Sequence, residues 1–295
     1  MFSVWSWSIY AYWFIILFFI ASTFYILGRS HEFIHPRSNV TVTEEALMQP
    51  ESYIESAKVK LIAGDMDAAI ADLNAAIDTN ASSNTYALRG EAYMQIGNYQ
   101  KALSDFDSAI QIDGMNAVAF YDRSLLNTRL ENYEAALADI NNALAAQSMK
   151  PTDVLNLRNL YAKRGQLNLW LKNWQGAVAD YTNSLARAEG SVSANVYAER
   201  AEAYTALGEY ENAINDYTSA VRVISEQIQA APSQEEREAQ SSNAMSYFEK
   251  SAALNLNIGN KDAAKSDLES AFAIAVALND EESMNRLQNL LSGLN

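Results

Sequence analysis

The sequence predicts an all-α fold, a solenoid built from about six helical hairpins. Three observations lead to this prediction. The stretch from Asn84 to Gly114 has the pattern of two amphipathic helices separated by a break at Gly97-Asn98. A similar pattern returns after about 34 residues, and a fixed period of this size marks a repeat array. No alternating pattern of useful length, as a strand would need, occurs anywhere in the sequence.

The composition limits the kinds of site that the chain can carry. Among its 295 residues there is no cysteine, which excludes disulfides, thiolate metal sites and cysteine nucleophiles. The net charge of −15 argues against nonspecific binding of nucleic acid, which needs a basic surface, and favours a basic or apolar partner. There is no glycine-rich phosphate loop and no serine elbow. We therefore predict no cofactor, no small-molecule substrate and no enzymatic activity.

Residues 1–28 are predicted to be a transmembrane anchor. From Ile9 to Leu27 no residue is charged and most are apolar, and about 20 such residues span a bilayer core as a helix. Trp5 and Trp7 lie toward one end and Tyr25 near the other, as in interfacial aromatic belts. A cleaved signal peptide is the alternative. It normally has Lys or Arg before the apolar run, and this chain has neither there.

Residues 29–43 are predicted to form a short juxtamembrane tether. Arg29 and Arg37 follow the span, whereas only the amino terminus is positive before it. The positive-inside rule therefore predicts a single-pass protein with its N-terminus outside and the repeat region in the cytoplasm.

One stretch of the tether matches a catalytic motif. His31, Glu32 and His35 have the H-E-x-x-H spacing, which in zinc proteases places two imidazoles on one helix face with the Glu as general base. Pro36 follows directly and disfavours helical geometry at His35. A catalytic zinc also needs a third protein ligand, and the chain has no further histidine. A zinc-dependent protease is therefore only a remote alternative, and we predict no metal site.

Residues 44–295 are predicted to form the solenoid. The fourth hairpin is expected to start early, soon after Pro151, and Asn279-Asp280 precedes a last helix at 281–292. A terminal helix with a polar outer face is what closes such an array, so this segment is predicted to be a capping helix. The six units fall at about 50–82, 83–116, 117–150, 152–190, 194–230 and 234–278.

The second unit contains the residues that connect the chain with a known family. Small residues and aromatic residues recur along its two helices, at Gly90, Ala102 and Ala109 and at Tyr93, Tyr99 and Phe106. This stretch resembles a tetratricopeptide repeat, a helix–turn–helix unit of 34 residues. The resemblance covers about residues 50–278. It implies a right-handed α-solenoid that serves as a protein-binding scaffold, and it does not name the ligand.

In that family the inner face of the first helices lines a concave, peptide-binding groove. By resemblance, the groove residues of the third and fourth units are Tyr121, Leu125, Arg129, Asn159, Gln166, Leu169 and Trp170. Trp170 and Leu169 have a second interpretation, in which they merely pack the first helix of the fourth unit. Aromatic residues and arginine at the centre of an interface often dominate binding, as the groove interpretation requires. The sequence does not decide between the two interpretations.

Some members of the family hold the C-terminal carboxylate of chaperones with Lys, Asn and Arg side chains from successive first helices. The corresponding places here hold Ala87, Glu91, Asp122, Asn159 and Lys163, and only the last resembles that clamp. Binding of a chaperone tail is therefore not expected.

A second periodicity places arginines on the first helices and aspartates on the second helices. These residues are either a basic stripe for an acidic ligand or a structural ladder that joins the two helices of each hairpin. The aspartate recurs in step with the arginine, which favours the ladder, and bidentate Arg–carboxylate pairs suit that role. The predicted pairs are Arg89 with Asp105, Arg123 with Asp139, Arg164 with Asp180, and Arg200 with Asp216.

The leading functional prediction is a membrane-anchored scaffold that binds another protein or peptide through its groove, as an assembly, recruitment or receptor factor. A structural accessory subunit of a larger membrane complex is the alternative, in which the aromatic-rich residues 1–28 are themselves an interface.

Overall fold

The computed structural model describes residues 49–149, 155–187 and 193–294. The predicted anchor at 1–28, the tether at 29–43 and the motif of His31, Glu32 and His35 all lie outside these residues. In the described part of the chain no helix is both long enough and apolar enough to cross a bilayer. Residues 49–295 form one compact unit.

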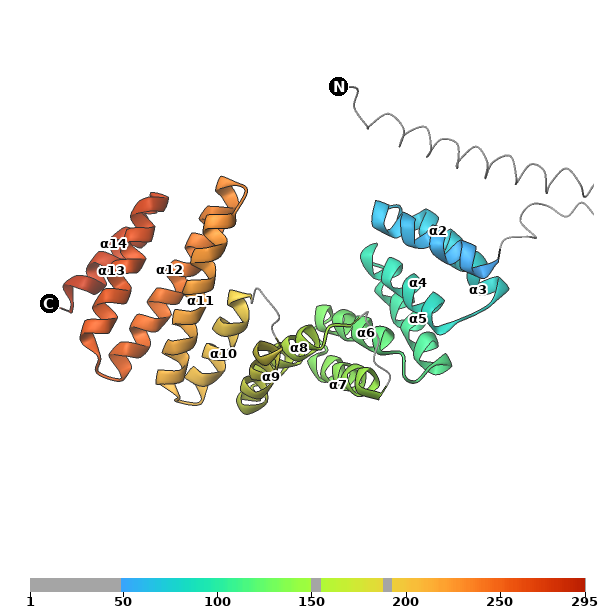
Figure 1. Ribbon diagram of the computed structural model, residues 1–295, viewed down its shortest axis with the longest axis horizontal. Coiled ribbons are helices and arrows are strands. Elements are labelled where there is room, and N and C mark those ends of the chain that lie inside the picture. The colour runs from blue at the N-terminus through green and yellow to red at the C-terminus, as the bar shows by residue number, and fades with distance from the viewer. Residues whose placement is uncertain (1–48, 150–154, 188–192, 295) are drawn as a thin grey trace, which may run out of the picture. The chain divides into compact units, whose positions relative to one another are not determined.

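The described residues form thirteen helices and no strand, so the predicted all-α class is confirmed for them (Figure 1). Each helix packs against the next along the chain, and the helices pair into six hairpins followed by α14. The helices are α2 (Pro50–Ala63), α3 (Met66–Thr79), α4 (Ser83–Gln95), α5 (Tyr99–Ile112), α6 (Ala117–Arg129), α7 (Tyr133–Met149), α8 (Leu157–Trp170), α9 (Trp174–Ala186), α10 (Ala194–Ala206), α11 (Tyr210–Ala230), α12 (Gln234–Asn257), α13 (Lys261–Leu278) and α14 (Glu281–Ser292).

The turn inside each hairpin contains one residue with a positive φ angle. It lies two residues before the first residue of the second helix. Glycine adopts this conformation without strain and occupies it in four hairpins, as at Gly97 with a φ of 78°. Glu131 and Lys172 take the same place in α6–α7 and α8–α9. In most turns an Asp or Asn follows and caps the second helix, for example Asn98, whose side chain accepts from the Lys101 amide.

The fourth hairpin begins later than the sequence suggested. Helix α8 starts at Leu157, and the Asn156 side chain caps it by accepting from the Arg158 amide at 2.9 Å. The early start predicted after Pro151 is therefore wrong. The start of α8 is determined by the Asn156 N-cap and not by the apolar residues that precede it.

The core of each hairpin pairs a small residue on the first helix with a large one on the second. Gly90 of α4 faces Phe106 of α5, and Gly165 of α8 faces Tyr181 of α9. Both rings are fully buried. Because one hairpin cannot bury both of its faces, buried side chains also join each hairpin to the next, and Leu287 of α14 completes the last cluster.

Candidate peptide-binding site

A pocket lies across the first helices of three successive hairpins. Its volume is about 250 Å³, and α6, α8 and α10 all contribute to it. The residues that line it are Tyr121, Asn159, Ala162, Lys163, Gln166 and Glu199. Tyr121, Asn159 and Gln166 belong to the predicted groove set, and the structure brings these three together.

The floor of this pocket is a chain of polar contacts. The Lys163 ammonium donates to Gln166 Oε1 at 3.0 Å, and Gln166 Nε2 donates to Glu199 Oε1 at 3.3 Å. Burial raises the pKa of the Glu199 carboxyl, although the nearby Tyr181 hydroxyl and the hydrogen bond from Gln166 act in the opposite direction. The charged form of Glu199 is therefore under-stabilised by its present partners.

Two acidic side chains lie next to the pocket, toward α4. Burial and, secondarily, the negative charge of Glu91 raise the pKa of Asp122 to about 7. Asp122 follows Tyr121 on α6. Burial raises the pKa of the Tyr121 hydroxyl, and the negative charge of Asp122 is the second, smaller cause. This part of the face carries excess negative charge.

A second, larger pocket of about 450 Å³ lies between α10 and α12. Most of its surface is apolar, with the ring of Tyr217 and the side chain of Leu254 in its wall. At its rim the Lys250 ammonium pairs with Glu202 at 2.7 Å, so that an ion pair joins the fifth and sixth first helices. The two pockets share α10.

The structure separates the remaining predicted groove residues from the first pocket. Leu125 is half-buried, and Leu169 is half-buried against the cluster that contains Tyr181. Trp170 is 43% exposed, and its ring packs against that of Tyr133 in a tilted arrangement, with 5.0 Å between centroids. Tyr133 is the first residue of α7, so this contact lies beside the hairpin turns.

Arg129 occupies the equivalent place one hairpin earlier. Its guanidinium lies over the ring of Tyr99, the first residue of α5, at 5.8 Å. Trp170 and Arg129 thus each pack on the start of the preceding second helix. They join neighbouring hairpins there, and neither lines the first pocket.

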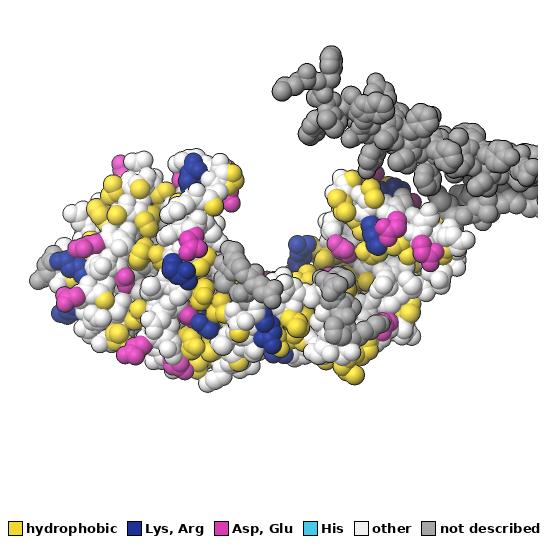
Figure 2. Space-filling view, viewed as in Figure 1, with side chains coloured by type: hydrophobic (Ala, Val, Ile, Leu, Met, Phe, Trp, Pro, Cys, Tyr) yellow, Lys and Arg dark blue, Asp and Glu magenta, His cyan; other side chains and the backbone are white. Residues whose placement is uncertain are grey.

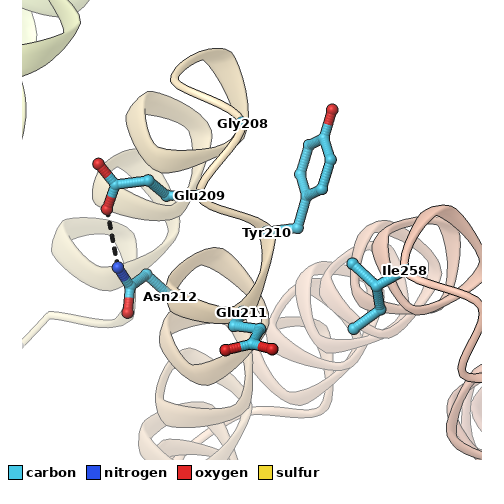
Figure 3. Close-up of a pocket in the computed structure, with 6 residues that line it drawn as sticks. All are labelled: Gly208, Glu209, Tyr210, Glu211, Asn212 and Ile258. Atoms are coloured by element: carbon cyan, nitrogen blue, oxygen red, sulfur yellow. Dashed lines mark hydrogen bonds between the residues drawn. The ribbon is translucent and has the colours of Figure 1, made fainter.

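The turn side of the array has a depression of its own, of about 330 Å³. Figure 3 shows Tyr210, from the start of α11, and Ile258, from the end of α12, among the residues that line it. Two of its polar side chains pair with each other, because Asn212 donates to Glu209 at 2.8 Å. Charged side chains of both signs lie among apolar ones on the described face of the molecule in Figure 2.

The four predicted Arg–Asp pairs all lie at hydrogen-bond distance. Arg89 donates through Nε and Nη2 to the two carboxylate oxygens of Asp105, at 2.8 and 2.7 Å. Arg123 with Asp139, Arg164 with Asp180, and Arg200 with Asp216 repeat this bidentate geometry. The aspartates are buried, and the hydrogen bond to its aspartate is the main cause that raises the pKa of Arg89, Arg123 and Arg164.

The remaining guanidinium nitrogen of each arginine reaches the preceding hairpin. Nη1 of Arg89 donates to Asn74 on α3 at 2.7 Å, and Nη1 of Arg123 donates to Asp107 on α5 at 2.5 Å. Arg164 and Arg200 reach Asn141 and Thr182 in the same way. Each arginine therefore fixes both the hairpin that carries it and the stacking on the previous one.

Comparisons with known proteins identify the repeat. Residues 83–116 and residues 194–226 each match a family model described as a tetratricopeptide repeat. A solved structure, the C-terminal part of a TPR repeat-containing protein from Cytophaga hutchinsonii, superposes with a TM-score of 0.60 at 16% identity, covering 80% of this chain and 87% of that one. The described helices have the tetratricopeptide-repeat fold.

Two further relatives agree with this fold. YrrB, described as a TPR protein with an unusual peptide-binding site, matches with a TM-score of 0.58 at 15% identity over 74% of this chain and 97% of its own. Sperm-associated antigen 1 of Homo sapiens is 30% identical over 90 residues, or 28% of this chain. This chain spans about a tenth of the length of that curated relative. None of these matches indicates an enzymatic family.

The tetratricopeptide-repeat pattern makes recognisable four charged residues, in or beside the two pockets, that sequence reasoning did not place in the groove. Glu199 and Lys250 were absent from the predicted groove, and Lys163 and Asp122 were considered only for a clamp. All four occupy the same place in the repeat, two residues before the small residue of the first helix, and their charges alternate in sign along the array. Aligning the six units and comparing their charges would have found them.

The described residues contain no group of three or more His, Asp or Glu side chains placed to hold a metal ion. The histidine pair of the zinc-protease alternative lies outside them, as stated above.

Proposed function

We propose that this protein is an interaction scaffold that holds a segment of another protein along its first helices, between α6 and α12. The observation that carries the proposal is the pocket to which three successive first helices contribute, with Tyr121, Asn159 and Glu199 in its wall. Ligand pockets are concave and combine apolar walls with a few polar groups that fix orientation, and this one does both. The second pocket extends the same surface to α12.

The chemistry of these surfaces favours a basic or apolar partner segment. The chain carries a net charge of −15, and part of this charge, on Glu91, lies beside the first pocket next to Asp122. The peptide-binding site named for YrrB, which has the same fold, supports the use of such an array for peptides. Nucleic acid is disfavoured by the same negative charge.

We further propose that residues 1–28 anchor the scaffold in a membrane, with the repeats in the cytoplasm. The uncharged run from Ile9 to Leu27 supports this assignment, and Arg29 and Arg37 support the orientation. In this arrangement the scaffold recruits or assembles its partner at the membrane surface.

Site-specific cross-linking tests the scaffold proposal. A photo-reactive amino acid at Asn159, which lines the pocket, is expected to capture the partner in intact cells. The same group at the exposed Glu134 of α7 serves as the matched control and is expected to capture nothing. Capture from Glu134 with none from Asn159 would place the interface on the second helices and refute the proposal.

Fractionation tests the membrane proposal separately. The full chain is expected to remain in the membrane pellet after alkaline carbonate extraction, and a variant without residues 1–28 is expected to leave it. Protease added from the cytoplasmic side is expected to digest the repeats. Protection of the repeats in sealed vesicles of that orientation would reverse the assigned topology.

The alternative of a structural accessory subunit is favoured by one observation, the exposed apolar side chains beside the turns. Trp170, Ile96 and Ile258 are each more than 40% exposed. If a partner subunit covers these side chains, a Trp170→Ala variant is expected to lose that partner and a Tyr121→Ala variant is expected to retain it. The groove proposal expects the reverse. A third variant replaces residues 1–28 by a neutral span. Loss of the partner in that variant would mean that residues 1–28, and neither the groove nor the turns, form the interface.

A further inference from the structure

The pocket across α6, α8 and α10 contains a carboxylate whose hydrogen-bonding capacity is largely unused. Within residues 49–149, 155–187 and 193–294, Glu199 accepts one hydrogen bond of good geometry, a long one from Gln166 Nε2 at 3.3 Å. The nearest lysine of the pocket, Lys163, directs its ammonium to the Gln166 oxygen instead. Among the described residues no ion pair to Glu199 occurs. An ionised carboxylate offers about four acceptor sites, so most of those on Glu199 are open to a ligand.

A second observation comes from the residue that packs behind this carboxylate. Tyr181 is 0% exposed, and within the described part of the chain its buried hydroxyl oxygen has no hydrogen-bond partner of acceptable geometry. Glu199 is nevertheless close enough to influence that hydroxyl electrostatically. Buried polar groups in folded proteins are nearly always paired. An unpaired polar group therefore lies behind the Glu199 carboxylate, outside the wall of the pocket itself.

The charges around the pocket determine which ligand would complete it. Asp122 lies beside Tyr121 on α6, and Glu202 follows Glu199 by one turn of α10. An acidic ligand group would be repelled by these three carboxylates. An apolar group would cover the Glu199 carboxylate without pairing it, which costs free energy.

Lys163 would repel a positively charged ligand group next to Glu199, but only weakly. Of the interactions that act on the Glu199 carboxyl, the Coulombic one with Lys163 is the smallest. The bond from Lys163 to Gln166 also holds its ammonium on the amide rather than on the carboxylate. The site can therefore accept a second positive charge next to Glu199.

We propose that this pocket receives one lysine or arginine side chain of the bound peptide. Its cationic end pairs with Glu199, and its hydrocarbon stem lies against the ring of Tyr121 and the methyl group of Ala162. The pocket volume of about 250 Å³ suits a single long side chain. This inference rests on the proposed function, since it names the side chain that the scaffold selects.

Selection from a random library of 12-residue peptides, displayed on phage and applied to the full chain in detergent micelles, provides the probes. The expected result is enrichment of lysine or arginine at one position. For an enriched peptide, replacing that lysine by norleucine is expected to weaken binding to the wild-type protein about tenfold, a typical coupling for a close charge pair. Glu199→Gln is expected to weaken the lysine peptide by a similar factor.

The double-mutant cycle is the decisive measurement. The norleucine peptide and the lysine peptide are expected to bind Glu199→Gln equally, because the partner of the ammonium is gone. Glu134→Gln removes the same charge from an exposed site on α7 and is expected to bind both peptides as the wild type does. Thermal melts followed by circular dichroism verify that each variant is folded.

The contrary outcomes distinguish this inference from the proposed function. Selected peptides that show no preference for a cation, but that Asn159→Trp displaces by filling the pocket, would overturn the inference and leave the scaffold function standing. Peptides that bind regardless of Asn159→Trp, or a selection that enriches nothing, would contradict the scaffold function itself.

Discussion

A Cβ atom added to Gly90 would stand 2.7 Å from Cε1 of Phe106. Real Cβ contacts are not this short, so the absence of a side chain at Gly90 is what allows the Phe106 ring to pack so close to α4. The same relationship holds between Gly165 and Tyr181, where the corresponding distance is 3.0 Å. In the fifth hairpin Ala201 faces Tyr217 at the equivalent place, so the fit differs from unit to unit.

Gly90→Ala is therefore expected to destabilise the protein by about 1–3 kcal/mol, the usual cost of overpacking a core. Urea unfolding followed by circular dichroism measures the loss. Gly114→Ala is the matched control, because a Cβ there comes no closer than 3.9 Å to any atom. Equal stability of the two variants would show that α4 and α5 can separate without cost.

Asp139→Ala is expected to cost about 3–5 kcal/mol, since it leaves the Arg123 guanidinium and the Asn127 amide without their buried acceptor. Asp107, the other partner of Arg123, is 64% exposed on its side chain, and Asp107→Ala is expected to cost far less because water replaces it. Unfolding midpoints in urea compare the two. Similar losses would mean that the contact between hairpins matters as much as the contact within one.

The raised pKa of Asp122 makes stability depend on pH. The folded pKa, about 7, is above the ordinary value of 3.8, so the folded protein binds more protons between these pH values, and stability falls as pH rises through this window. Asp122→Asn removes the penalty. We expect it to gain about 1–2 kcal/mol over the wild type between pH 5 and pH 8. Glu91 and Tyr121 are the titratable groups that face Asp122.

Urea unfolding at both pH values checks this expectation, with Glu134→Gln as the control that shows no such dependence. A constant difference between Asp122→Asn and the wild type would mean that Asp122 is hydrated in the folded protein.

Tyr121→Ala and Trp170→Ala are expected to behave differently. Tyr121 lines the pocket, so its loss is expected to weaken peptide binding several-fold. Its ring also packs against the core cluster that contains Leu160, so some stability is lost as well. Trp170 packs against Tyr133, and its loss is expected to cost about 1 kcal/mol of stability while leaving peptide affinity unchanged. Fluorescence anisotropy with a selected peptide and urea unfolding separate the two effects. A loss of affinity in Trp170→Ala would extend the site to the turns.

Much of the fold follows from local features of the sequence. The small residues, the aromatic positions and the Asp or Asn before most second helices act within one hairpin, where spacings of three and four residues determine which side chains meet. The pairing of Arg123 with Asp139 is foreseeable for the same reason, because both belong to one repeating unit. The late start of α8 is not, since a single cap, Asn156, decides it.

Contacts between hairpins are harder to foresee. The reach of Arg89 to Asn74, and of Trp170 to Tyr133, depends on how far each hairpin is rotated on the previous one. That rotation results from the packing of many side chains together. Sequence reasoning therefore assigned Trp170 to the groove on helical position alone, and overlooked Glu199, whose charge became significant only beside Tyr181 and Gln166.

The series of arginines that connect neighbouring hairpins stops at the fifth hairpin. At the place of Arg200, the sixth hairpin carries Ser251, which donates to Asp267 within its own hairpin at 2.7 Å. Helix α12 meets α11 instead through the rings of Tyr247 and Tyr217, 5.9 Å apart, and meets α10 through the ion pair of Lys250 with Glu202. We expect unfolding to lose its all-or-none character at this junction, so that amides of α12–α14 exchange with solvent before those of α4–α9.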